Sequence, residues 1–179
     1  LFYLLGADHH GYVDRLKAAA ACLGVPPERV EIRIGQLVNL LRSGEPVRMS
    51  KRAGETIDLD EVLEEVGADV LRYHFLRQGL DSTIDFDLAV VTAQSMENPV
   101  YYVQYAHARI ASVLRNADER GFDPGSSDDA DLSLLTHPAE LALLTAMAGL
   151  PLVVAEAAEL RATQRLARYA EELAGTFHR

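Results

Sequence analysis

The chain has 179 residues, 49% of them hydrophobic, and a formal net charge of −10 at pH 7. This length corresponds to about one domain or slightly more, with ample apolar material for a packed core. The negative charge argues against non-specific coating of nucleic acid, although a local basic groove remains compatible with it.

Apolar runs in the sequence stay well short of the ~20 residues that a membrane span needs, and no signal-peptide pattern is seen. We therefore expect a soluble, cytoplasmic protein with no membrane partner. The single cysteine, Cys22, lies in an alanine-rich apolar stretch and is predicted to be a buried structural thiol. The first residue is not methionine, so we expect a fragment of a longer protein.

The chain begins with an apolar run, residues 1–5, that predicts a buried strand, followed by a helix over residues 12–23. Strand and helix together are half of a βαβ unit, and ligands bind at the carboxyl ends of parallel strands. Asp8 and His9 lie at that position. Three interpretations are open for them: a helix cap with polar neighbours, a zinc site, or contacts to a nucleotide and substrate. The zinc site is the weakest of these, because no second cluster of ligands follows at metal-binding spacing. We predict no metal site.

Two short apolar runs between residues 29 and 47 predict two strands, or one strand with a bulge. Gln36, between them, is either an ordinary turn residue or a donor to an adenine edge. The strands lead to V-R-M-S-K-R-A-G, residues 47–54. Its three cations and its serine suit phosphate binding, and the alternative is a solvated basic turn.

Helices are predicted over residues 58–66 and 68–78, the first opened by a near capping box of Asp58 and Glu61. The polar connector 79–87 is expected to hold the domain boundary. Further helices are predicted over 88–96, from Asn98-Pro99 onwards, and over 138–148, 152–160 and 163–177, with a loop at 121–131. The fold class is α/β followed by all-α, a Rossmann-like portion joined to a helical bundle.

Residues 98–109, N-P-V-Y-Y-V-Q-Y-A-H-A-R, combine aromatic and hydrogen-bonding side chains. Such side chains suit stacking on unpaired bases, and the alternative is that the tyrosines fill the bundle core. The buried stripe of this helix is predicted to follow the apolar spacing. Its members are Val100, Val103, Ala106 or His107, Ile110, and Val113 or Leu114.

Four stretches resemble one protein family. R-M-S-K-R-A-G resembles the K-M-S-K-S signature loop of class I aminoacyl-tRNA synthetases, in the M-S-K-R-x-G form of arginyl-tRNA synthetases. G-A-D-H-H-G-Y, residues 6–12, is similar to the G-x-D-H-x-x-Y segment of that family. Residues 98–109 and 158–179 resemble helices of its anticodon-binding domain. The motifs follow the family's order and span the chain.

The resemblance implies a domain over residues 1–80, the C-terminal portion of the catalytic domain, and a helical anticodon-binding domain over residues 81–179. It implies an arginine-tRNA ligase, which activates arginine with ATP and transfers it to tRNA(Arg). Mg²⁺ would arrive with ATP and needs no dedicated site. The family's H-I-G-H-type motif would precede residue 1, so little activity is expected of the isolated chain. We expect a monomer.

The resemblance also implies roles for particular residues. The catalytic residues would be Lys51, Ser50, Arg48 and Arg52. ATP and substrate would be bound by Gly6, Ala7, Asp8, His9, Gln36 and Met49. The tRNA would be bound by Asn98, Tyr102, Gln104, Tyr105, His107, Arg109, Arg165 and Arg168.

The sequence departs from the family pattern at Arg48, which replaces a lysine, at Asp14, where proline is frequent, and at Thr163-Gln164, where Pro-His is common. The last departure places the tRNA contact at that position in doubt. Two alternatives stay open. One is a non-catalytic paralogue or tRNA-binding module. The other is a different class I synthetase, such as a cysteinyl or methionyl enzyme, but residues 98–109 argue against it.

Overall fold

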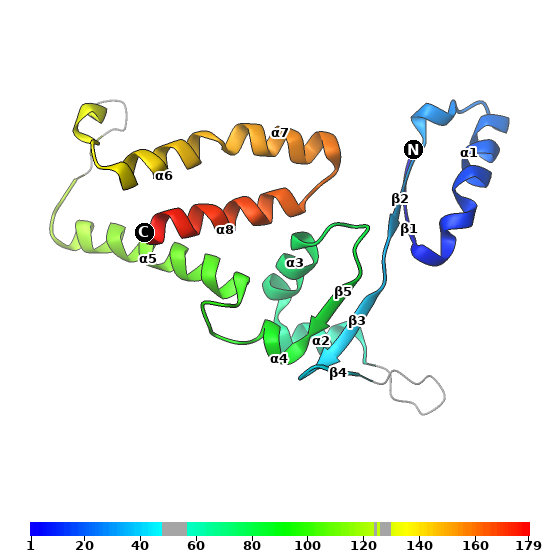
Figure 1. The fold of residues 1–179 in the computed structure, drawn as a ribbon, viewed down its shortest axis with the longest axis horizontal. Coiled ribbons are helices and arrows are strands. Elements are labelled where there is room, and N and C mark those ends of the chain that lie inside the picture. The colour runs from blue at the N-terminus through cyan, green and yellow to red at the C-terminus, as the bar shows by residue number, and fades with distance from the viewer. Residues whose placement is uncertain (48–56, 124, 126–129) are drawn as a thin grey trace. The chain divides into compact units, whose positions relative to one another are not determined.

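The computed structural model describes residues 1–47, 57–123, 125 and 130–179. It divides into two compact units, Leu1–Val91 and Thr92–Arg179, which are taken separately below (Figure 1). The predicted phosphate-binding residues Arg48, Met49, Ser50, Lys51 and Arg52 lie outside the described residues. Their roles stay predictions.

The first unit opens with the expected strand and helix, but the expected burial of the strand is wrong. Phe2 is 56% and Leu4 is 62% exposed, because the sheet to which the strand belongs has only two strands in the described part of the chain. Strand β1 (Phe2–Gly6) pairs in parallel with β2 (Glu31–Gly35), so that Gly6 lies opposite Gly35. Between the two strands run η1 (Ala7–Tyr12), α1 (Val13–Cys22) and η2 (Pro27–Arg29). Cys22 is exposed at the end of α1, so the prediction of a buried thiol is wrong. On the inward face of α1, Ala20 is buried and Val13 and Leu16 are half-buried.

A second sheet has the strand order β4 (Glu45–Pro46), β3 (Val38–Arg42), β5 (Ile84–Asp87). Strand β3 is antiparallel to β4 and parallel to β5. Strand β5 lies in the stretch predicted to be a polar connector. It belongs to the sheet because its apolar residues alternate with aspartates and Phe86 is only 2% exposed. The first unit therefore extends to Val91, beyond the boundary expected after residue 80.

Helices α2 (Leu59–Val66), α3 (Ala68–Arg77) and α4 (Leu88–Val91) complete the first unit. Gly67, with a φ of 82°, separates α2 from α3, as the sequence predicted. Two expectations are wrong: Asp58 makes no capping hydrogen bond through its side chain, and α4 ends at Val91 instead of residue 96. The core is formed by Val62, Val66, Leu71, Phe86, Leu88 and Val91.

The second unit is helical, as predicted. Its helices are α5 (Pro99–Glu119), α6 (Pro138–Ala148), α7 (Leu150–Leu160) and α8 (Gln164–His178), with a short η4 (Leu132–Leu134) before α6. Helix α8 packs against α5, α6 and α7 (Figure 1). Asn98 caps α5 by accepting a hydrogen bond from the backbone N–H of Val100, and His137 with Glu140 forms a capping box for α6.

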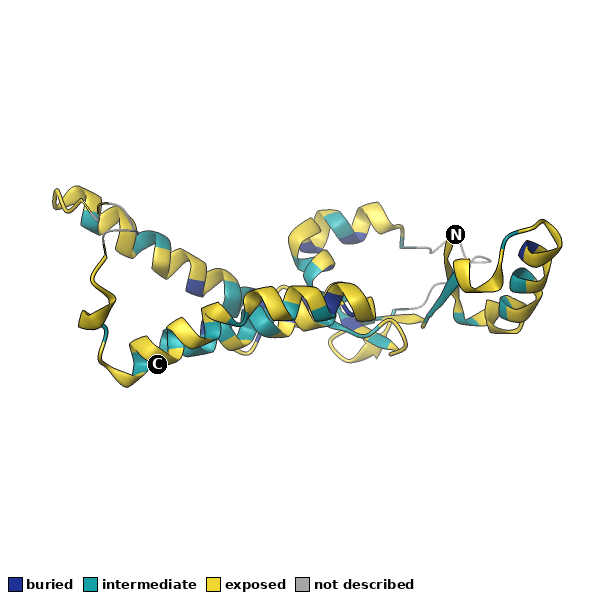
Figure 2. Ribbon diagram, turned by 90° about the horizontal axis from the view of Figure 1, so that it is seen from above, coloured by how far each residue is buried: buried dark blue, intermediate teal, exposed yellow. Residues whose placement is uncertain are grey.

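Among the described residues of the second unit, the buried apolar side chains are small. Apart from Val100, the buried apolar residues are alanines: Ala106, Ala157, Ala162, Ala167 and Ala174. The predicted stripe on α5 is confirmed at Val100 and Ala106 only. Its far half is exposed, at 42% for Ile110, 62% for Val113 and 64% for Leu114. Figure 2 shows the same pattern, with isolated buried positions along helices that are otherwise exposed or half-buried.

Helices α6 and α7 also correct an expectation about membranes. Among the residues that the structure describes, the stretch Pro138–Leu160 is long and apolar enough to cross a membrane by length and composition, and 6% of its apolar window is buried. The expectation that no run approaches this length is therefore wrong. The apolar run is interrupted by Gly149, which separates the two helices, and by Pro151 in the first turn of α7.

Candidate functional site

One group of predicted site residues gathers at the carboxyl ends of β1 and β2. Gly6 ends β1 and is the N-cap of η1, which holds Ala7, Asp8 and His9. Gln36 follows directly after β2, and its backbone N–H donates to the carbonyl of Leu80 at 3.0 Å. Because parallel strands end at one edge, these residues share the position where such sheets bind ligands.

The carboxylate of Asp8 fixes the orientation of His9. Asp8 Oδ1 lies 2.8 Å from His9 Nδ1, and the side chains are 78% and 51% exposed, respectively. A Cβ at position 6 would come within 2.8 Å of Asp8 Oδ1, so glycine leaves room for this carboxylate. Neither Asp8 nor His9 caps the helix, since the N-cap is Gly6. Exposed and pre-oriented, the pair can hydrogen-bond the hydroxyls of a ribose or a polar substrate.

Among residues 1–47, 57–123, 125 and 130–179, no three His, Cys, Asp or Glu side chains gather closely enough to hold a metal ion. Asp8 and His9 are thus two potential ligands without a third in the described part of the chain. Their geometry suits hydrogen bonding better than metal coordination.

A second polar cluster holds the turn between β3 and β4. The carboxylate of Asp87 accepts hydrogen bonds from the backbone N–H groups of Ser43 at 3.0 Å, Gly44 at 2.6 Å and Ala89 at 3.0 Å. The Gly44 bond, followed by those from Ser43 and Ala89, lowers the pKa of Asp87. Ser43 has a φ of 54°, a conformation that non-glycine residues seldom adopt, so the turn needs such support.

We expect Asp87→Asn to lower the free energy of unfolding of the first unit at pH 7. This loss should become smaller as the pH falls. A carboxyl group whose pKa is lower in the folded state stabilises that state at any pH above its pKa in the unfolded chain, which is about 3.9. This stabilisation is lost as the pH falls through the folded-state pKa. Urea unfolding of both proteins at pH 7, 5 and 3 measures the difference. Asp81→Asn, at an exposed aspartate nearby, is the control. A difference that stays constant down to pH 3 would contradict the assignment.

In the helical unit, three predicted tRNA-binding residues join an aromatic cluster between α5 and the end of α8. The rings of Tyr102 and Tyr105 lie 5.1 Å and 5.6 Å from the ring of His178. Arg109 Nη1 lies 2.9 Å from His178 Nδ1, and its guanidinium lies over the ring of Phe177 at 5.6 Å. Because a guanidinium only donates, Nδ1 of His178 accepts and its proton is assigned to Nε2.

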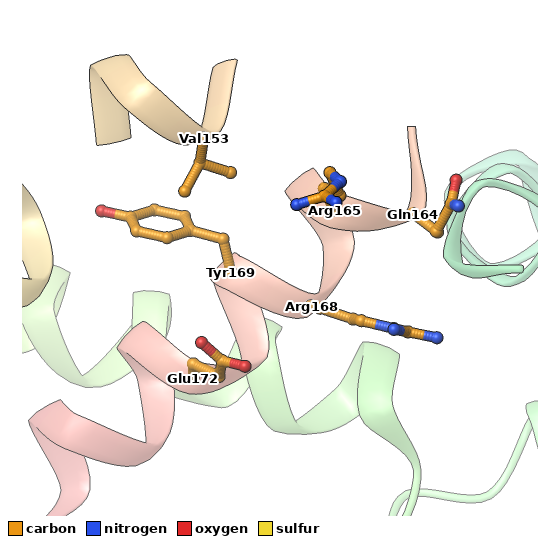
Figure 3. A pocket seen from close by; sticks show the side chains of 6 residues that line it. All are labelled: Val153, Gln164, Arg165, Arg168, Tyr169 and Glu172. Atoms are coloured by element: carbon orange, nitrogen blue, oxygen red, sulfur yellow. The ribbon is translucent and has the colours of Figure 1, made fainter. Parts of the chain in front are cut away.

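The other two predicted arginines lie at the opposite end of α8. They line a pocket of about 330 Å³ (Figure 3), whose lining residues are Val153, Gln164, Arg165, Arg168, Tyr169 and Glu172. Arg165 donates to Glu156 at 2.8 Å, and the Tyr169 hydroxyl donates to the carbonyl of Ala146 at 3.0 Å. In Figure 3 the Arg168 side chain extends away from Tyr169 and Glu172.

The structure therefore separates the predicted tRNA residues into two groups. At 1.5 Å per residue, Arg165 and His178 lie about 20 Å apart along α8, too far for one nucleotide to contact both. Gln104 is exposed on α5, and His107 lines a largely apolar pocket of about 420 Å³ with Val103 and Met147.

Asn98 belongs to neither group. It is 6% exposed, and its side chain is engaged in capping α5 and in a 2.7 Å hydrogen bond to the carbonyl of Ala93. A tRNA contact through this side chain would break those bonds, so the structure supports a capping role in place of the predicted one.

Sequence reasoning missed Phe177 and His178 in the aromatic cluster, and Val153, Tyr169 and Glu172 in the pocket. It noted Gln164 only as a departure from the family pattern. A helical-spacing signal was present, because Arg165 and Tyr169 are four residues apart and share a face. The approach of His178 to α5 had no such signal, since it depends on how two distant helices pack.

Comparison with known proteins identifies relatives of the chain. Residues 103–179 match the model of the DALR anticodon binding domain. The whole chain is 55% identical to an arginine-tRNA ligase of Frankia alni, over 100% of this chain and 32% of that protein.

Solved structures agree with the sequence comparison. A Campylobacter jejuni protein assigned as an arginyl-tRNA synthetase matches with a TM-score of 0.87 and 39% identity, over 99% of this chain and 38% of the other. The arginyl-tRNA synthetase of Thermus thermophilus matches with a TM-score of 0.76 and 26% identity, over 99% and 32%. The chain thus spans about a third of the length of these relatives. Residues 103–179 are thus similar to a DALR anticodon binding domain, and the chain as a whole is similar to about a third of an arginyl-tRNA synthetase.

Proposed function

We propose that this chain is part of an arginine-tRNA ligase, which activates arginine with ATP and transfers the arginyl group to tRNA(Arg). The observation that carries the proposal is the 55% identity to such a ligase over the full 179 residues, which include the signature-like residues 48–54. The whole enzyme would be a cytoplasmic monomer, and this chain would supply its phosphate-binding loop and its anticodon-binding helices.

In the activation step, the edge formed by Gly6, Ala7, Asp8, His9 and Gln36 would bind ATP and substrate. Asp8 and His9 have the exposure and orientation to hydrogen-bond ribose hydroxyls. Met49 would assist them from the loop. Mg²⁺ would arrive with ATP and neutralise phosphate charge there without a dedicated protein site.

Amino-acid-dependent exchange of pyrophosphate into ATP by the full-length protein tests the proposal. Exchange should depend on arginine and fail with cysteine, methionine and the other amino acids of a panel. The isolated 179-residue chain should give little or no exchange. Activation of another amino acid would place the protein among other class I synthetases, and no exchange at all would favour a non-catalytic paralogue.

The aromatic cluster would bind the anticodon loop, where unpaired bases stack on aromatic side chains. Tyr105 is the best-placed ring, because it is 40% exposed and lies parallel to Tyr101 at 6.2 Å. Tyr105→Ala should weaken tRNA(Arg) binding by roughly 5- to 150-fold, since stacking is worth about 1–3 kcal/mol per base. Tyr105→Phe should retain most of the affinity.

Filter binding or fluorescence titration of the full-length protein measures this loss. The matched control is Leu114→Ala, which removes another exposed side chain from the same helix. Equal affinity of Tyr105→Ala and Leu114→Ala would remove Tyr105 from the tRNA site.

A further inference from the structure

His178 on α8 lies within the aromatic cluster, but neither of its ring nitrogens is available to tRNA. Its Nδ1 lies 2.9 Å from Arg109 Nη1 and accepts a hydrogen bond from that group. Its Nε2, to which the proton is assigned, is buried and has no hydrogen-bond partner among the described residues. Any part that the imidazole plays in binding tRNA therefore passes through its neighbours.

Packing alone does not explain a histidine at this position. The ring of His178 lies 5.1 Å, 5.6 Å and 5.7 Å from the rings of Tyr102, Tyr105 and Phe177. A phenylalanine would make the same kind of ring contacts without a buried N–H that lacks an acceptor, which is destabilising. The feature that imidazole has and a phenyl ring lacks is the acceptor Nδ1. Its use in this structure is the hydrogen bond from Arg109.

Arg109 is held from two sides and keeps donors for a ligand. His178 accepts from Nη1, and the ring of Phe177 lies 5.6 Å from the guanidinium carbon, within the range of a cation–π contact. The side chain is exposed, and a guanidinium carries five N–H donors in a planar fork. In the described part of the chain, one of these donors is used. The others can bind a phosphate oxygen or a base edge of tRNA, and holding the fork in place beforehand reduces the entropy lost on binding.

The neighbours of His178 offer no paired negative charge to a protonated ring. Among the described residues, no carboxylate forms an ion pair with it, and Glu156 of α7 is paired with Arg165 instead. On the same face of α8, the acidic residue is Glu171, two turns away at about 10 Å along the helix. The pocket beside Phe177 is lined by Leu143 and Met147 of α6 and by His107 of α5. The other titratable or charged neighbours are Tyr102, Tyr105 and Arg109 on α5 and Arg179 on α8.

A proton on His178 would therefore release Arg109. A protonated imidazole has two donors and no acceptor, so the hydrogen bond is lost and two cations adjoin each other. We infer that His178 is a positioning residue of the tRNA site, which holds Arg109 in place when neutral and releases it when protonated. This inference rests on the proposed function. It makes tRNA(Arg) binding weaker in acid through a residue that was not among the predicted tRNA contacts.

The test is the dissociation constant of tRNA(Arg) and the full-length protein, measured by fluorescence titration at about pH 8 and about pH 5.5, a range in which histidines gain a proton. His178→Asn places an amide oxygen near the position of Nδ1, so it can accept from Arg109 at both pH values. Between these pH values, the unaltered protein should lose about tenfold more affinity than His178→Asn, the size expected for a hydrogen bond to a charged group.

A second variant separates the acceptor from the ring. His178→Phe keeps a ring without an acceptor, so it should bind tRNA(Arg) about tenfold more weakly than the unaltered protein at about pH 8 and show no such loss in acid. In an Arg109→Ala background, His178→Phe should cause no further loss, because its effect passes through Arg109.

The matched control is His10→Asn, the same change at an exposed histidine of the first unit, which should keep the acid response of the unaltered protein. An acid response of His178→Asn equal to that of the unaltered protein would overturn the positioning role and leave the ligase assignment intact. So would losses from His178→Phe and Arg109→Ala that multiply. Failure of the unaltered protein to bind tRNA(Arg) at about pH 8 would overturn both the positioning role and the proposed function.

Discussion

Lys51→Ala in the full-length protein should lower the rate of arginine activation by roughly 100- to 1,000-fold while changing ATP affinity much less. In adenylation, negative charge develops on the α-phosphate and the departing pyrophosphate, and a positioned cation stabilises that charge more in the transition state than in the ground state. Ser50, Arg48 and Arg52 would assist with a hydroxyl donor and additional charge. The measurement is kcat for pyrophosphate exchange together with the dissociation constant of ATP.

The sequence contains its own control for this experiment, because Lys17 on α1 is the other lysine of the chain. Lys17→Ala removes the same charge and should leave exchange unaffected. A Lys51→Ala variant that weakens ATP binding and leaves kcat intact would show that the loop binds the ground state. An unchanged rate would remove Lys51 from the catalytic residues altogether.

The predictions that succeeded depend on signals local in sequence. The strand that ends at Gly6, the glycine break at Gly67 and the cap at Asn98 each follow from the preferences of a few adjacent residues. The anticodon-binding domain followed from residues 98–109 and 158–179, which resemble known helices. The similarity of residues 103–179 to the DALR anticodon binding domain agrees with that resemblance.

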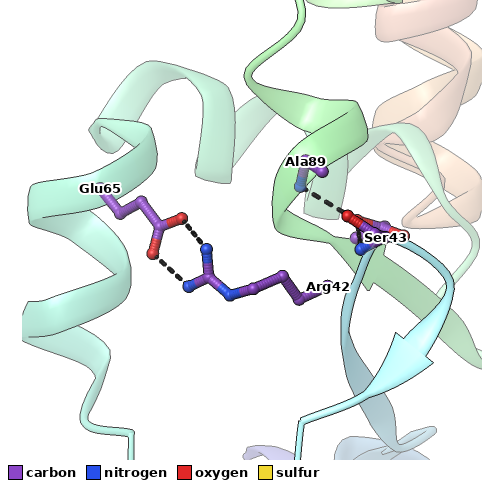
Figure 4. A network of polar contacts seen from close by, with 5 residues as sticks. Arg42, Ser43, Glu65 and Ala89 are labelled. Carbon is purple, nitrogen blue, oxygen red and sulfur yellow. Dashed lines mark hydrogen bonds and ion pairs between the residues drawn. The ribbon is translucent and has the colours of Figure 1, made fainter.

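The failures concern contacts between distant segments. Strand β5 was interpreted as a polar connector because Asp85 and Asp87 dominate its composition, although its alternating pattern suits a strand with one buried face. Its pairing with β3 joins segments more than forty positions apart, as the Asn39 to Asp85 hydrogen bond shows, and local propensity does not contain that information. The same holds for the contact between Arg42 and Glu65, whose residues belong to no recognisable motif (Figure 4).

The part of the candidate site that is local in sequence was predictable, and the part that depends on contacts between distant segments was not. Gly6, Asp8 and His9 are adjacent in sequence, so one strand end places them together, and parallel pairing of β1 with β2 adds Gln36. The tRNA residues were selected as one set from two helices. The structure divides them between the two ends of α8, because their grouping depends on helix packing.

Phe86→Ala should cost the first unit about 3–5 kcal/mol, the usual range for truncating a buried aromatic side chain. Phe86 is 2% exposed, stacks on Phe75 at 5.5 Å and meets the edge of His74 at 5.8 Å, so its removal leaves a cavity between β5 and α3. A loss of this size is a large part of the stability of a small domain.

Hydrogen exchange followed by mass spectrometry is the suitable measurement, because two compact units need not unfold together. In Phe86→Ala, protection should fall in peptides from α2, α3 and β5 and persist in α5 and α8. Phe122→Ala, which truncates a phenylalanine that is 64% exposed, should change neither set. If protection fell equally in both units, the two would unfold together, and the boundary at Val91 would not separate two unfolding units. If it fell in neither, Phe86 would contribute little to the stability of the first unit.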